Sequence, residues 1–142
     1  MAERAGRETE VPAALLMAIA RHVSGFRAGA ISNDGRVGLM QLQPDLLRGQ
    51  GIQPGNLQDP QNNMRKGAEY VRQLTLRLGS IKMAMAAYLD GPDAVADAGG
   101  VPGDARTIWF VREMTRLYYA SIREFPNEIG AESMAFVWNW MN

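Results

Sequence analysis

The chain has 142 residues, 46% of them hydrophobic, so it has room for one domain with one sizeable core. Its 15 basic and 15 acidic side chains cancel, which argues against a partner attracted by net charge, such as nucleic acid or an anionic membrane. The sequence contains no cysteine and a single histidine, which excludes disulfides, thiolate zinc sites and multi-histidine metal sites. We therefore expect no metal or cofactor.

No segment of the sequence is typical of a membrane span. The apolar run over residues 11–20 is too short to cross a bilayer, and residues 1–10 lack the apolar stretch of a signal peptide. We expect a soluble chain with no transmembrane segment. If the protein is exported, its signal lies upstream of residue 1.

The first predicted helix covers residues 11–23. Pro12 suits its first turn, its Ala, Leu, Met and Ile residues are adequate or strong helix formers, and Gly25 supplies a stop. Its nearly continuous apolar character predicts that most of its circumference is covered. Residues 29–38, rich in Gly, Ser, Asn and Asp, predict a loop or a short irregular hairpin, and a short helix is expected over 39–47.

The second half of the chain has the clearest helical periodicity. Asp59-Pro60 starts a helix whose apolar residues recur at three- and four-residue spacing until Gly79 ends it. Residues 81–88 predict another compact apolar helix, and residues 107–123 an amphipathic one. Strand signals are sparse, so the predicted fold class is all-α.

The end of the chain carries a separate apolar cluster. We divide the chain into an N-terminal segment (1–10), a helical domain (11–123) and a C-terminal extension (124–142). The extension is expected to pack on its own domain, and a contact with a partner or near a membrane is the alternative. Its apolar residues are Met134, Phe136, Val137, Trp138, Trp140 and Met141.

Five motifs in the chain together resemble one protein family. In chain order they are Ala18-Ile19-Ala20-Arg21-His22-Val23-Ser24-Gly25-Phe26, Gly38-Leu39-Met40-Gln41-Leu42-Gln43-Pro44, Leu57-Gln58-Asp59-Pro60-Gln61-Asn62-Asn63-Met64 with Gly67 and Tyr70, Ala86-Ala87-Tyr88-Leu89-Asp90-Gly91-Pro92, and Thr107-x-x-Phe110-Val111. In this order and spacing, over roughly residues 11–114, they resemble the Slt-type lytic transglycosylases, goose-lysozyme-like enzymes that cleave bacterial cell-wall glycan. The resemblance implies an all-α, lysozyme-like helical domain with a central cleft.

Val23 stands where the family pattern, Ala-Ile-x-x-Glu-Ser-x-Phe, has its catalytic glutamate. By resemblance, that glutamate protonates the glycosidic oxygen and then takes the proton of the muramyl 6-hydroxyl, which closes an anhydro ring without water. A general acid needs a titratable proton, and valine has none. His22 is adjacent, but neighbouring residues of a helix point about 100° apart, so it cannot take the missing position. No catalytic residue is therefore assigned.

Two further departures fall at positions that the family uses around the cleft. Leu89 stands in place of asparagine and Phe110 in place of tyrosine, and each change deletes a hydrogen-bonding group. With Val23, three apolar replacements converge on the inferred cleft, as an inactive relative would show. Asp90 is a candidate substitute acid, although Asp90-Gly91-Pro92 is also typical of a helix-ending turn.

The resemblance also implies a set of substrate-binding residues. Core packing is the alternative for the methionine and the tyrosine in this set, and a helix-end role is the alternative for the serine. The set is Ser24, Met40, Gln41, Tyr88, Leu89 and Phe110.

From these features we predict a lytic-transglycosylase-like pseudoenzyme of the bacterial periplasm or cell envelope. It would bind peptidoglycan glycan strands or chitooligosaccharide-like ligands, or serve structurally beside the proteins of a secretion or conjugation assembly. One alternative is an active transglycosylase with a relocated carboxylate, Asp90 or the tail's Glu128 or Glu132. Another is a deliberate inactivation, which would need only one of the three replacements. A third is a protein-interaction module that uses Trp138 and Trp140.

Overall fold

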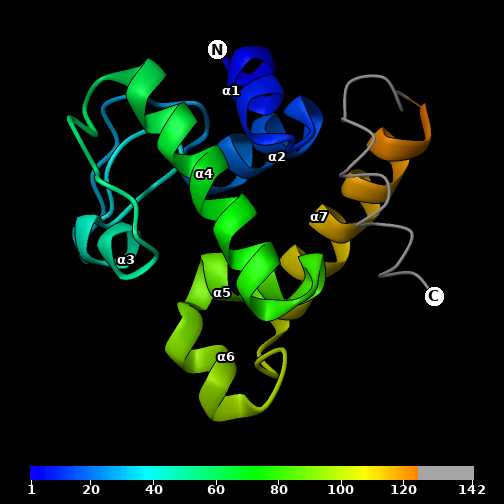
Figure 1. The fold of residues 1–142 in the computed structure, drawn as a ribbon. Coiled ribbons are helices and arrows are strands. Elements are labelled where there is room, and N and C mark those ends of the chain that lie inside the picture. The colour runs from blue at the N-terminus through cyan, green and yellow to red at the C-terminus, as the bar shows by residue number, and fades with distance from the viewer. Residues whose placement is uncertain (125–142) are drawn as a thin grey trace.

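The computed structural model describes residues 1–124, which form seven α-helices and no strand (Figure 1). The predicted all-α class is thereby confirmed. No helix in this part of the chain is both long and apolar enough to span a bilayer. The predictions made for the tail after Pro126 lie outside the described residues. The helices are α1 (Ala2–Thr9), α2 (Ala13–Ser24), α3 (Pro44–Gly49), α4 (Pro60–Leu78), α5 (Ile81–Asp90), α6 (Pro92–Ala98) and α7 (Ala105–Glu124).

The strongest sequence signals give the expected helices. α4 has Pro60 in its first turn and ends at Gly79, whose φ of 82° is a left-handed conformation that glycine adopts without strain. α2 ends in the same way at Gly25, with φ of 60°. One detail of α2 differs from the prediction that most of its circumference is covered. Met17 is 45% exposed, which leaves part of that helix open to solvent.

The short helix predicted over residues 39–47 begins later than expected, at Pro44. The residues before it form a compact irregular hairpin, in which Val37 makes isolated bridges to Ile31 and Leu42. Gln41 turns the chain with a left-handed φ of 50°. Pro44 lacks a backbone N–H and therefore fits the first turn of α3, where no intrahelical bond is required.

Helix α1 was not predicted. It packs on α2 and α4 through small side chains, Ala2, Ala5, Gly6 and Thr9, which have helical spacing but little apolar character. A Cβ on Gly6 would lie 2.7 Å from the carbonyl oxygen of Val11, so glycine permits this close approach of the backbones. Glu10 ends α1 with φ of 61° and pairs with Arg72 at 3.5 Å.

Helix α5 is the centre of the domain. It packs on α4, α6 and α7, and α2 also packs on α7. Its seven buried residues include Tyr88 and Leu89. The hairpin and α3 lie on the opposite side of α4 from α7 (Figure 1). The motif residues of α2, the hairpin, α5 and α7 are thus brought together around one core.

Candidate functional site

The last turn of α2 carries the residue at the family's glutamate position. Val23 is half-buried and packs against the hydrophobic core. The next residue, Ser24, donates its hydroxyl to the carbonyl oxygen of Ala20 at 2.9 Å, so its hydrogen is used within the helix. The position that the resemblance aligns with the family's glutamate is therefore occupied by the methyl groups of Val23.

His22 lies against α7. Its ring centroid is 4.9 Å from that of Phe110 and 5.3 Å from that of Trp109. Burial lowers the pKa of His22 below its usual 6.5, and the positive charge of Arg106 lowers it further. A neighbouring carboxylate would act in the opposite direction. Within the described residues, the charge that shifts the pKa of His22 is therefore the positive charge of Arg106.

The other two apolar replacements face the core. Phe110 is fully buried and Leu89 is 5% exposed. Both sit on elements that also hold motif residues, α7 and α5. A polar group at either position would need a hydrogen-bond partner inside the protein, and the residues present remove that requirement.

Tyr88 and Met40 form one buried connection between α5 and the hairpin. The Tyr88 hydroxyl donates to the carbonyl oxygen of Met40 at 2.5 Å, and the Met40 side chain is fully buried. Burial raises the pKa of Tyr88. A Cβ on Gly67 would lie 2.7 to 2.9 Å from Met40 side-chain atoms, so this glycine makes room for the methionine. These contacts give both predicted binding residues a packing function.

Gln41 is also occupied by the backbone around it. Its amide nitrogen donates to the carbonyl oxygens of Gly38 at 2.9 Å and Ala30 at 3.1 Å, and the residue is 8% exposed. Both bonds close the hairpin onto itself. The six predicted binding residues thus gather around one core, each no more than 8% exposed, and their contact with glycan stays a prediction.

Asn63 of α4 anchors the hairpin, a role that sequence reasoning did not assign to it. Its Oδ1 accepts from the backbone N–H of Met40 at 2.8 Å, and its Nδ2 donates to the carbonyl oxygens of Val37 at 2.8 Å and Leu57 at 2.9 Å. The side chain is fully buried. A Cβ on Gly38 would collide with this amide. The signal was available, because Asn63 and Gly38 both stand in the motifs.

Arg36 is a second positioning residue that was missed. Its guanidinium donates to the carbonyl oxygens of Leu89 at 3.0 Å and Tyr88 at 3.4 Å, near the end of α5. It also pairs with Asp34 of the hairpin at 3.1 Å. A cation at a helix C-terminus is favourable. No local pattern could have found it, because the two segments are far apart in the sequence.

Asp90, the candidate substitute acid, is tied to the start of α7. The Thr107 hydroxyl lies 2.6 Å from Asp90 Oδ2 and 2.8 Å from Asp104 Oδ2, so the two carboxylates share one donor. The backbone N–H of Thr107 donates to Asp104 Oδ1 at 2.9 Å. Hydrogen bonds from the backbone N–H and the hydroxyl of Thr107 lower the pKa of Asp104. Asp90 therefore takes part in the junction between the end of α5 and the start of α7.

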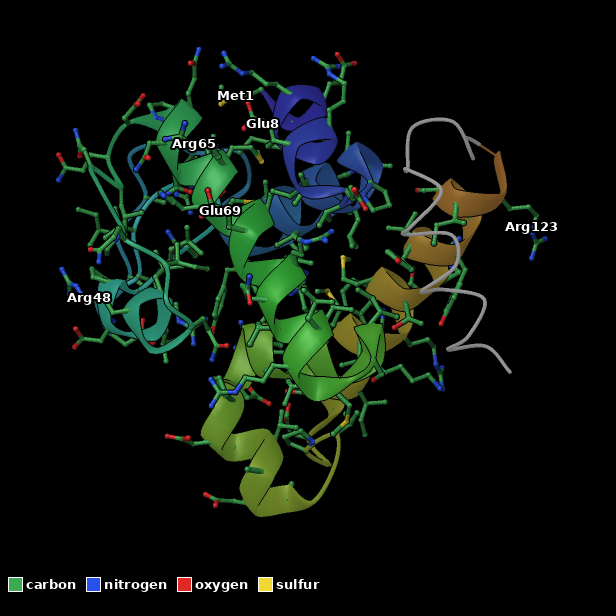
Figure 2. All side chains as sticks on the ribbon, viewed as in Figure 1. Met1, Glu8, Arg48, Arg65, Glu69 and Arg123 are labelled. Atoms are coloured by element: carbon green, nitrogen blue, oxygen red, sulfur yellow. The ribbon has the colours of Figure 1, made fainter. Side chains whose placement is uncertain are left out.

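Two hollows and two exposed aromatic residues mark the open surface. A hollow of about 430 Å³ lies between α1 and the start of α4, where Figure 2 shows Met1 and Glu8 beside Arg65. Another, of about 380 Å³, is lined by Ala28, Gly29, Ile31, Val37 and Gln58 around the hairpin. Trp109, beside His22, is 52% exposed, and Phe26, just after α2, is 47% exposed. The exposed side of Trp109 is therefore an aromatic surface next to the six buried residues of the predicted binding set.

Comparison with solved structures identifies the fold. An inactive variant of the lytic transglycosylase Slt from Pseudomonas aeruginosa superimposes with a TM-score of 0.68 at 23% identity, covering 91% of this chain and 25% of that one. The 70 kDa soluble lytic transglycosylase Slt70 from Escherichia coli gives 0.67 at 25% identity, covering 92% and 25%. A 70 kDa soluble lytic transglycosylase in complex with bulgecin A gives 0.66 at 24%, covering 89% and 24%.

These likenesses confirm the predicted lysozyme-like fold of the lytic transglycosylases, and the chain spans about a quarter of the length of these proteins. The family described as transglycosylase SLT domain matches residues 1–109, which is most of the chain. The family match to the sequence and the likeness of the fold together show that the chain belongs to the transglycosylase SLT domain family.

Proposed function

We propose that this SLT domain has lost glycan cleavage and serves instead to bind peptidoglycan glycan strands or to act structurally in a cell-envelope assembly. The observation that carries the proposal is the end of α2, where Val23 packs against the core beside a histidine whose pKa is lowered. A periplasmic or envelope location follows from the proposed ligand.

The chemistry makes the loss of one carboxylate severe. In the mechanism that the resemblance implies, a single glutamate donates a proton to the leaving oxygen and then accepts one from the attacking hydroxyl. Removing a general acid or base commonly lowers the rate by about 10²- to 10⁴-fold, and here both transfers would be affected. The Pseudomonas protein offers a parallel, because its inactive variant has one glutamate changed to glutamine.

A relocated acid has little support among the described residues. Asp90 shares the Thr107 hydroxyl with Asp104 at the start of α7, as a residue that joins two helices would. Burial and the positive charge of Arg106 lower the pKa of His22, and no carboxylate of the described residues contributes to this shift. Both residues are engaged in contacts within the fold, and we propose that neither replaces the family's glutamate.

Trp109 supports the binding part of the proposal. Because the six residues implied by the resemblance are almost completely buried, a glycan strand would first meet the exposed side chains around them. The indole of Trp109 packs against His22 on one side and leaves 52% of the residue exposed. An exposed aromatic face can pack against the apolar face of a pyranose ring. We therefore assign Trp109 to the glycan-contacting surface.

Restoration of the missing groups tests the proposal. We expect Val23→Glu alone to release no anhydromuropeptides from purified peptidoglycan, because Leu89 and Phe110 still lack the polar groups of the family pattern. The triple variant Val23→Glu, Leu89→Asn, Phe110→Tyr is expected to release them. Activity from the single variant would show that the cleft is otherwise intact and that the other two replacements are not part of the loss.

Folding of each variant is checked by far-ultraviolet circular dichroism, because a buried asparagine or tyrosine can destabilise the core. A folded triple variant that stays inactive would contradict the view that these three positions account for the loss of cleavage.

A further inference from the structure

An exposed cation and an exposed aromatic ring lie on one face of α7, next to the end of α2. Arg106 and Trp109 are three positions apart, a spacing that makes two side chains neighbours on a helix. The ring of Trp109 packs on that of His22 at a centroid distance of 5.3 Å, and the charge of Arg106 reaches the same ring, where it lowers the pKa. The two side chains thus flank His22, and together they form the Arg106–Trp109 surface.

The guanidinium of Arg106 is free to bind a ligand. Among residues 1–124 it forms neither a salt bridge nor a side-chain hydrogen bond. The acidic group that senses its charge is Asp104, whose pKa it helps to lower. That carboxylate already accepts hydrogen bonds from the backbone N–H of Thr107 at 2.9 Å and from its hydroxyl at 2.8 Å. The donors of Arg106 itself therefore remain without a direct partner in this part of the chain.

The stability of α7 does not account for an arginine at this position. Arg106 lies in the first turn of the helix, which contains no acidic residue. The helix dipole places partial positive charge there and disfavours a cation, although Asp104, just before the helix, offsets part of it. Arg106 and the start of α7 thus contribute charge of the same sign, and this sign favours an anionic ligand.

The two side chains together recognise a specific combination of groups. An indole face packs against the apolar face of a sugar ring, and a guanidinium pairs with a carboxylate through two parallel hydrogen bonds. Three positions on a helix correspond to about 4.5 Å along its axis, so one sugar residue can contact both side chains. Muramyl residues of peptidoglycan carry a carboxylate on their lactyl group or on the peptide joined to it. Chitooligosaccharides carry none.

We propose that the Arg106–Trp109 surface selects acidic glycan, with Trp109 packed on a sugar ring and Arg106 paired with the carboxylate that this sugar carries. This inference rests on the proposed function and deepens it by naming acidic saccharides in preference to neutral ones. Arg106 is then a specificity-determining residue, whose contribution is the difference in affinity between the two kinds of ligand. Both side chains are exposed, so the six buried motif residues do not have to become accessible.

Isothermal titration calorimetry tests the proposal with saccharides that differ in charge. The acidic ligand is a tetrasaccharide of alternating N-acetylglucosamine and N-acetylmuramic acid, and its methyl ester is the uncharged comparison. We expect the natural chain to bind the acid about threefold to fivefold more tightly than the ester, as a solvent-exposed ion pair allows. A form with peptides on the lactyl groups shows whether the lactyl or the peptide carboxylate is recognised, and a preference for either over the ester supports the proposal.

Two variants of α7 identify the cation responsible. Arg106→Gln should abolish the preference for the charged ligand. The matched control is Arg112→Gln, which removes the same charge from an exposed residue of the same helix, about 120° further around its axis, and should retain the preference. Loss of the preference in both variants would show that net charge, and not this surface, selects the ligand.

The failure of this inference is distinguishable from failure of the proposed function. Chitotetraose, a neutral ligand of the same length, reports glycan binding as such. Equal affinity for the ester and both charged forms would overturn the selection of acidic glycan and leave glycan binding in place. If none of the saccharides binds, both the glycan-binding role and this inference are wrong.

The ring of His22 provides a second readout, which locates the carboxylate of the ligand. Nuclear magnetic resonance titration gives the pKa of His22 in the complexes with the acid and with the ester. A carboxylate paired with Arg106 offsets the positive charge near the ring, so the pKa of His22 should be higher in the complex with the acid. The same pKa in both complexes would place the carboxylate away from Arg106 and overturn the proposal.

Discussion

The hairpin side of the domain and the end of α2 differ in how closely their residues match the family motifs. In and beside the hairpin, the motif residues Gly38, Gln41 and Asn63 are present, and the two amides form hydrogen bonds with backbone groups of the hairpin. At the cleft positions, Val23 and Phe110 stand where the pattern has polar groups, and both pack as core residues. The residues that hold the hairpin match the family pattern, and we propose that the apolar residues at the inferred cleft mark the loss of its chemistry.

This difference indicates that the residues required for folding and the residues required for catalysis are physically separable. Asn63 cannot be replaced by an apolar residue without leaving the Met40 N–H and the Leu57 carbonyl unpaired, whereas an isolated tyrosine hydroxyl or glutamate in a buried site is itself a cost. Loss of the reactive groups therefore need not weaken the fold. A domain that no longer cleaves glycan can retain its shape.

The largest effect is expected from breaking the hairpin anchor. Asn63→Ala leaves the N–H of Met40 and the carbonyl of Leu57 without their partner, at about 1–3 kcal/mol for each buried group, while the carbonyl of Val37 keeps the N–H of Leu42. We expect the free energy of unfolding to fall by at least about 2 kcal/mol, measured by urea denaturation.

Asn33→Ala is the control for this variant, since Asn33 is exposed on the hairpin. It should change the free energy of unfolding by less than about 0.5 kcal/mol. A loss below about 1 kcal/mol for Asn63→Ala would show that the hairpin is held by something other than this anchor.

A smaller effect is expected at the exposed aromatic surface. If glycan packs on Trp109, Trp109→Ala should weaken chitooligosaccharide binding by about twofold to tenfold, measured by isothermal titration calorimetry, with little change in stability. Leu76→Ala, at a residue of similar exposure on α4, serves as the control and should bind as the natural chain does. Equal affinity for both variants would remove Trp109 from the binding surface, and no binding by the natural chain would favour a purely structural role.

The most local effect concerns the charge at the end of α2. Nuclear magnetic resonance titration of the single histidine should give His22 a pKa below 6.5, and Arg106→Ala should move it upward. Because the unfolded chain binds this proton more readily, the contribution of His22 to stability is complete above pH 6.5 and is lost as the pH falls from there through the lower folded-state pKa. A pKa above 6.5 would reveal a carboxylate beside the ring and would revive the relocated-acid mechanism.

Sequence periodicity was sufficient for the helices that carry strong local signals. α4 and α7 have apolar residues at regular spacing, and the glycine after α4 adopts the left-handed conformation that ends a helix. α1 was missed because its buried face consists of small residues such as Ala5 and Gly6, whose packing depends on close backbone approach to α2. The buried residues do recur at helical spacing, but small and polar side chains such as these do not stand out as an apolar face in the sequence.

The site was predicted less completely than the fold. Motif order brought Tyr88, Met40 and Gln41 to one place, but it could not show that backbone carbonyls already occupy the hydroxyl of Tyr88 and the amide of Gln41. The contacts of Arg36 with the end of α5 were likewise invisible, because they join segments that only the folded chain brings together. Burial and hydrogen-bond partners are tertiary properties, and they decide which motif residues are free to meet a ligand.

The central claim is tested most directly by incubating the natural chain with purified peptidoglycan and measuring released anhydromuropeptides. The account predicts no release above a protein-free control, together with no loss of turbidity. Clear release that is abolished by Asp90→Asn would contradict it, because it would show that this domain still cleaves glycan with a relocated carboxylate.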